Sequence, residues 1–118
     1  MRIHWEDKAE WNLHQIEDYI FERFGPDSLE KFMDRVDQSV ETILRYPNIG
    51  PVEPLLADLP QSYHSVVVGN LSKIVYRVED EVIYIADIWD CRREPKAMAG
   101  EVKSGAKEIE TINNKHNV

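Results

Sequence analysis

Apolar side chains recur at spacings of three and four residues between positions 29 and 44, and this is the strongest periodic pattern in the chain. They are Leu29, Phe32, Met33, Val36, Val40, Ile43 and Leu44. This spacing places them along one stripe of an α-helix, opposite a face of charged and polar side chains. We therefore predict an amphipathic helix from Asp27 or Ser28 to about Arg45, which must pack against another apolar layer.

A second stripe of the same kind precedes it and predicts a helix over residues 8–24. Its members are Ala9, Leu13, Ile16, Ile20 and Phe24. Asp7 precedes Glu10 by three residues, which has the form of a capping box at the start of a helix. Residues 25–26 are Gly-Pro, which ends the helix because glycine accepts a left-handed cap and proline cannot continue the hydrogen-bond ladder. The two helices should therefore form an antiparallel hairpin.

The periodicity changes from helix to strand after an irregular loop. Four prolines between positions 47 and 62 predict that loop. Three β-rich runs follow, at Tyr63–Val68, Lys73–Val78 and Val82–Trp89, and the short turns between them predict an antiparallel meander. The last run begins with five nearly continuous apolar residues, which is typical of a central strand buried on both faces.

The fold class that follows is α+β, with the element order β-α-α-β-β-β. Residues 2–6 alternate in polarity and predict a short first strand that joins the meander as an additional strand. The helix hairpin then covers one face of the sheet, and the opposite face needs another cover. We expect one domain over residues 1–98 and a polar C-terminal extension over 99–118, helical at first and frayed at its end.

Composition and charge limit the classes of function. The chain has 118 residues and a net charge of −8, and residues 1–62 carry 13 Asp and Glu against 6 Lys and Arg. Long-range attraction of nucleic acid should therefore be weak. The absence of a signal peptide and of a long apolar run predicts a cytoplasmic protein with no membrane partner. Cys91 is the only cysteine, and phosphate-loop and paired-histidine motifs are absent, so we expect no metal or cofactor.

Four segments, in their order and spacing, resemble the RelE/ParE toxin superfamily, which includes plasmid stabilisation system proteins. They are Ile16-Glu17-Asp18-Tyr19-Ile20, Tyr46-Pro47-Asn48-Ile49-Gly50, Lys73-Ile74-Val75-Tyr76-Arg77 and Ile88-Trp89-Asp90-Cys91-Arg92-Arg93-Glu94-Pro95. The resemblance implies the toxin of a type II toxin–antitoxin system, which inhibits growth until a cognate antitoxin neutralises it. ParE-like members of this superfamily inhibit DNA gyrase, and RelE-like members cleave messenger RNA on the ribosome.

The ribonuclease alternative requires cations that contact phosphate. Metal-independent RNA cleavage uses a base on the ribose 2′-hydroxyl and positive charge on the phosphate, for which arginine is well suited. The candidates are Arg92 and Arg93 after the last strand, with Lys73 and Arg77 on the strand before. Lys73 occupies a position where RNA-cleaving relatives often carry arginine. Each of the four could instead be a surface cation or the partner of a carboxylate.

A general base is harder to assign. His64 is a weak candidate because histidine titrates near neutrality, and Asp90 stands where many relatives have histidine. Two neighbouring arginines should lower the pKa of Asp90 and make it a poor base. Trp89, with Arg92 and Arg93, has the composition of a protein-interface hot spot or of a base-stacking platform, although it could equally pack under the C-terminal segment.

The missing base and the acidic balance favour a ParE-like toxin that binds a protein target such as DNA gyrase. One alternative is a RelE-like, ribosome-dependent mRNA endonuclease, and another is a weakened toxin that retains only antitoxin binding. In all three cases we expect an antitoxin segment to wrap the exposed sheet face and the helix grooves. The assembly would then be a homodimer or a toxin–antitoxin hetero-oligomer.

Overall fold

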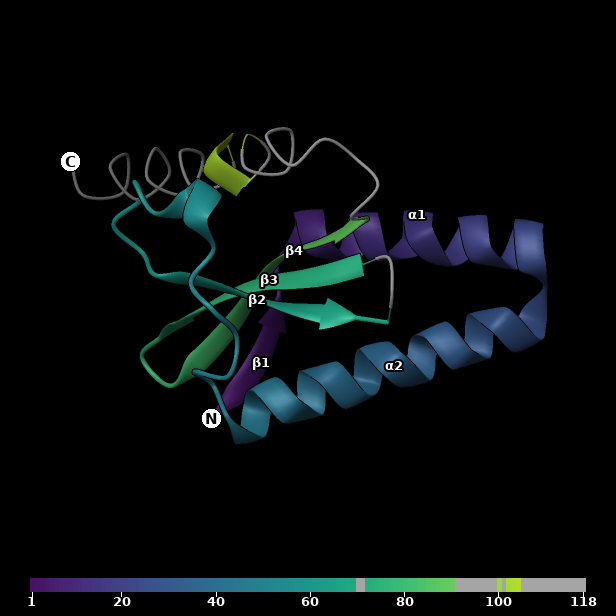
Figure 1. The fold of residues 1–118 in the computed structure, drawn as a ribbon, viewed down its shortest axis with the longest axis horizontal. Coiled ribbons are helices and arrows are strands. Elements are labelled where there is room, and N and C mark those ends of the chain that lie inside the picture. Colours follow the sequence, from purple (N-terminus) through teal and green to yellow (C-terminus); the bar gives the residue numbers. More distant parts are fainter. Residues whose placement is uncertain (70–71, 91–99, 101, 105–118) are drawn as a thin grey trace.

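The computed structural model describes residues 1–69, 72–90, 100 and 102–104 (Figure 1). The element order is β1 (Arg2–Trp5), α1 (Asp7–Phe24), α2 (Pro26–Arg45), the 3₁₀ turn η1 (Pro54–Leu56), β2 (Tyr63–Val68), β3 (Ser72–Glu79) and β4 (Val82–Asp90). The predicted α+β class and order of elements are confirmed. No helix in these ranges combines the length and apolarity that a membrane span requires.

The four strands form one sheet in the order β1-β4-β3-β2. The meander β2–β3–β4 is antiparallel, and β1 pairs in parallel with β4, which is therefore a central strand as its apolar sequence predicted. The register between β3 and β4 shifts between Val75 and Tyr76. This irregularity allows Ile85 and Ile88, three residues apart, to join the same core, because a bulge interrupts strict alternation.

The helix hairpin covers one face of the sheet (Figure 1). Phe32, Val36 and Ile43 of α2 are buried there, as the helical periodicity predicted. The buried stripe is narrower than expected, because Met33 and Leu44 are 44% and 39% exposed. The Gly-Pro connection is confirmed, with Gly25 at φ +90° and α2 beginning at the proline itself.

The opposite face of the sheet is covered by the chain's own loop and by residues near position 102 (Figure 1). The second core cluster comprises Leu56, Tyr63, Val75, Ala86, Trp89 and Val102. Lys103 also donates a 2.9 Å hydrogen bond to Asp58, which joins the two covering segments. This arrangement supplies, from the chain itself, the cover that the sequence required.

The predicted capping box at the start of α1 is wrong. Asp7 is already helical, and Glu6 is the N-cap residue without a side-chain capping bond. The Glu6 carboxylate instead accepts a hydrogen bond from Arg77 on β3. A tertiary ion pair has therefore replaced the local cap that the sequence suggested.

Candidate functional site

The chain's candidate site lies at the end of the sheet where β2 stops, β3 begins and β4 stops. Ser72 pairs with Val68 on one side and with Asp90 on the other, so these three strand ends meet. The sequence continues from Asp90 to Arg92 and Arg93, the predicted phosphate-binding pair. Both arginines lie outside the residues that the structure describes, so their assignment stays a prediction.

Lys73 is not a free cation. Its Nζ donates a 2.8 Å hydrogen bond to Oε2 of Glu53, which is only 3% exposed. Glu53 is the N-cap residue of the turn η1, so the pair fastens the proline-rich loop to β3. Lys73 therefore has the carboxylate partner that was its alternative assignment, and the buried carboxylate needs this positive charge. The phosphate contact of Lys73 stays a prediction.

Arg77 is also paired with carboxylates of its own chain. It is 7% exposed, and its guanidinium donates to Glu6 and, over 3.2 Å, to Glu79. It also lies 4.5 Å from the centroid of the Tyr84 ring. Burial acts to lower the pKa of Arg77, but the hydrogen bond to Glu6 and the electrostatic interactions with Glu6, Tyr63 and Glu79 together outweigh it and raise the pKa, so the guanidinium stays charged. Arg77, like Lys73, thus has the carboxylate partners that were its alternative assignment, and its phosphate contact stays a prediction.

His64 has a structural role in the loop that follows α2. Its Nδ1 lies 2.7 Å from the carbonyl oxygen of Gly50, and its ring stacks on Tyr76 with centroids 5.6 Å apart. Since a carbonyl can only accept, Nδ1 donates this hydrogen bond, and in the neutral ring Nε2 is then the nitrogen that could accept a proton. These contacts explain His64 as a structural residue, and its role as a base stays a prediction.

The Trp89 side chain is not exposed at the surface. It is 1% exposed and belongs to the second core cluster with Leu56 and Val102. This burial agrees with the alternative assignment, packing beneath a C-terminal segment, because Val102 belongs to the same cluster. A role of Trp89 in binding a partner stays a prediction.

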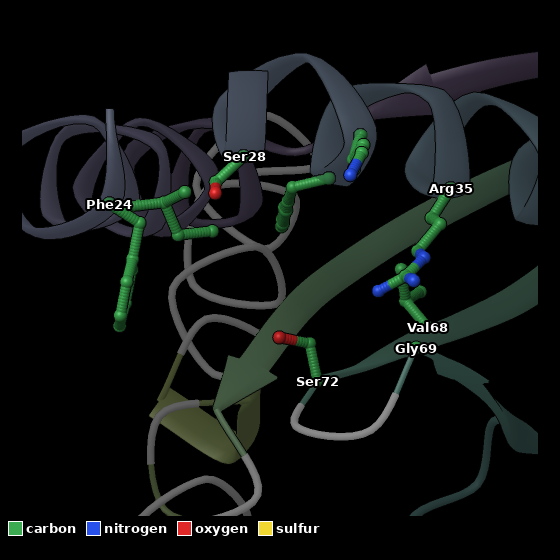
Figure 2. A pocket seen from close by; sticks show the side chains of 9 residues that line it. Phe24, Ser28, Arg35, Val68, Gly69 and Ser72 are labelled. Carbon is green, nitrogen blue, oxygen red and sulfur yellow. The ribbon is translucent and has the colours of Figure 1, made fainter. Parts of the chain in front are cut away.

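A pocket that the sequence did not reveal lies under the helix hairpin, beside the turn between β2 and β3 (Figure 2). We call it the hairpin pocket. Its volume is about 280 Å³, and its lining includes Ile20, Phe24, Phe32, Val68, Lys31 and Arg35. The available sequence signal was the spacing of Lys31 and Arg35, which places both cations on one side of α2. This spacing did not predict a pocket, because the charged face of α2 was interpreted as a surface exposed to solvent.

Comparison with known proteins identifies a family. The sequence matches the family described as "ParE toxin of type II toxin-antitoxin system, parDE" over residues 3–95. A search among curated proteins finds no match.

Solved structures share the fold. A chain of the chromosomal ParDE TA system from P. aeruginosa superposes with a TM-score of 0.63 at 22% identity, covering 76% of this chain and 95% of that one. A chain of the YoeB dimer from Staphylococcus aureus gives a TM-score of 0.50 at 22% identity, covering 74% of this chain and 92% of that one. At this level of identity the two similarities concern the fold alone.

Proposed function

This chain belongs to the ParE toxin family of type II toxin–antitoxin systems, and on that premise we propose that it inhibits growth by binding DNA gyrase rather than by cleaving RNA. The main support for this proposal is that two cations on β3 are already engaged in ion pairs. Lys73 and Arg77 are both paired with carboxylates of the same chain. A cognate antitoxin neutralises the toxin.

Recruiting these cations to a phosphate would be costly. Moving Lys73 to a ligand would leave Glu53, 3% exposed, without its partner. Moving Arg77 would remove the hydrogen bonds that Glu6 and Glu79 accept. Breaking a buried ion pair typically costs about 3–5 kcal/mol, so these residues are better explained as fixed parts of the scaffold.

The overall charge does not favour ribonuclease activity. The chain carries a net charge of −8, and His64, the weak candidate base, already holds the loop after α2 through its Nδ1 contact with the Gly50 carbonyl. A protein that acts on RNA usually gains affinity from many phosphate contacts. For the ribonuclease alternative, Arg92 and Arg93 remain the first candidates for the phosphate contact.

Expression in cells tests the proposal with one engineered pair. Lys73→Met together with Glu53→Gln removes both members of the ion pair, so no unpaired buried charge remains. We expect this double variant to inhibit growth as the parent chain does, with altered plasmid supercoiling and intact ribosome-bound messages. Co-expression of the protein encoded by the adjacent reading frame should restore growth.

Arg92→Ala combined with Arg93→Ala gives the contrasting variant. Message cleavage by the parent chain that this variant abolishes would contradict the proposal and establish the ribonuclease alternative. A parent chain that binds the antitoxin without slowing growth would instead indicate a toxin that has lost its target activity. Circular dichroism of each variant confirms that the fold is retained.

A further inference from the structure

The hairpin pocket combines a buried apolar floor with positive charge, although the chain as a whole is strongly acidic. Phe32 and Val68 form the floor and are 8% and 5% exposed. Phe24 lies at the rim and is 64% exposed. Lys31 and Arg35 line the same pocket. The arrangement has an apolar surface and a cationic edge, which together suit an amphipathic acidic ligand.

The two cations, Lys31 and Arg35, are not neutralised by carboxylates of the part of the chain that the structure describes. They stand four residues apart on α2, and like charges at this spacing destabilise a helix by roughly 0.2–0.5 kcal/mol. Their juxtaposition is therefore explained better by an external anion than by stability.

Arg35 is also held in place. Gly69 has φ +62°, and a Cβ atom built on it would lie 3.2 Å from Nη1 of Arg35. The guanidinium thus rests across the backbone of the turn after β2. Figure 2 shows Arg35 reaching from α2 toward Val68 and Gly69, with the Ser28 and Ser72 hydroxyls on other sides of the pocket.

We propose that the hairpin pocket receives an acidic segment of the antitoxin, which places an apolar side chain on Phe32 and Val68 and a carboxylate against Lys31 and Arg35. The volume of about 280 Å³ lies at the lower limit of the roughly 300–1,000 Å³ of small-molecule sites, and it has room for side chains of a peptide. The cationic edge supplies the charge complementarity that selects an acidic segment. The assignment of this acidic segment to the antitoxin rests on the proposed function.

Peptide titration followed by amide NMR of the full chain tests the chemistry without the antitoxin. The probes are three blocked peptides of equal length with leucine at the same positions and glutamate, glutamine or lysine at the others. The glutamate peptide should shift the amide signals of Phe32, Arg35, Val68 and Gly69, and it should bind roughly tenfold more tightly than the glutamine peptide. The lysine peptide should not bind.

Two substitutions with the same change of charge provide the control. Arg35→Glu should weaken binding of the glutamate peptide by tenfold or more, whereas Arg45→Glu, at the far end of α2 in an exposed pair with Glu41, should leave it unchanged. Lys31→Gln provides a second pocket variant should Arg35→Glu disturb the fold. Equal binding of the glutamate and glutamine peptides, or equal effects of Arg35→Glu and Arg45→Glu, would overturn the proposal.

The protein encoded by the adjacent reading frame tests the source of the segment. Arg35→Glu should weaken its affinity for the toxin by tenfold or more, with Arg45→Glu unchanged. Unchanged antitoxin affinity in an Arg35→Glu variant that no longer binds the glutamate peptide would overturn the antitoxin assignment. Growth inhibition by the variant, measured without antitoxin, reports separately on the proposed action at gyrase.

Discussion

Tyr76 links the middle of the sheet to the loop that follows α2. Its side chain is fully buried, its hydroxyl donates to the Pro47 carbonyl over 2.8 Å, and it accepts from the Gly50 amide at 3.2 Å. The neighbouring His64 binds the Gly50 carbonyl. Both polar groups of Gly50 are therefore held by side chains from adjacent strands, which fixes the path of the loop.

Gly50 should not tolerate even a methyl group. A Cβ at this position would lie 2.4 Å from the backbone oxygen of Ser65, so either the loop or the edge strand must move. We expect Gly50→Ala to lower the free energy of unfolding by about 2 kcal/mol or more, because overpacking against backbone cannot relax by a change of rotamer. Urea denaturation measures this difference. A loss below about 0.5 kcal/mol would show that the loop is not closely packed.

Buried tyrosines should make the fold sensitive to alkaline pH. Burial raises the pKa of Tyr76 and of Tyr63 above the ordinary value of 10.0. The folded chain then holds these protons more tightly than the unfolded chain, so their contribution to stability is complete below pH 10 and is lost as pH rises further. Unfolding in urea between about pH 9 and 11 should show this decline.

The matched variant is Tyr76→Phe. It should be less stable at neutral pH by about 1–2 kcal/mol, because two hydrogen bonds are lost. Its stability should also decline less steeply above pH 10 than that of the parent chain. Identical slopes for the two proteins would exclude Tyr76 as a source of the alkaline transition.

The ion pairs of Lys73 and Arg77 explain the limit of prediction at the scale of the residue. Both residues look like available cations on a strand, and only the tertiary structure supplies their partners. Glu53 is 20 residues away from Lys73, and Glu6 is 71 residues away from Arg77. No local spacing rule connects such positions, so the sequence could not separate a ligand-binding cation from a structural one.

Secondary-structure elements were more predictable, because their periodicity is local. The stripe on α2, the Gly-Pro turn and the three strand runs all correspond to observed elements. The width of the buried stripe on α2 could not be predicted, because it depends on the shape of the sheet below. Met33 shares the apolar stripe with Ile43, yet it is 44% exposed where Ile43 is fully buried.

This difference within α2 can be measured. Ile43→Ala should lower the free energy of unfolding by about 2–5 kcal/mol, because it removes buried methyl groups and leaves a cavity. Met33→Ala, on the same helix, should change it by about 0.5 kcal/mol or less, since alanine also has the higher helix propensity. Chemical denaturation of the two variants should rank them in this order. Similar losses would mean that Met33 packs against a partner, as a toxin dimer would require.

The whole molecule is a four-stranded sheet with helices on one face and its own loop on the other. The sequence predicted that the second face needs a cover, but it did not predict that the segments around Leu56 and Val102 provide it. The hairpin pocket was missed altogether, because it forms where residues from both helices meet a turn of the sheet. A pocket of this kind forms only when several elements come together, so the sequence of any single element gives little indication of it.

Supercoiling by purified DNA gyrase, measured with and without this chain, tests whether gyrase is its target. We expect the parent chain to block supercoiling and the Lys73→Met, Glu53→Gln variant to block it equally, because this ion pair belongs to the scaffold. Unimpaired supercoiling at a toxin concentration that cuts ribosome-bound messages in a purified translation reaction would show that gyrase is not the target.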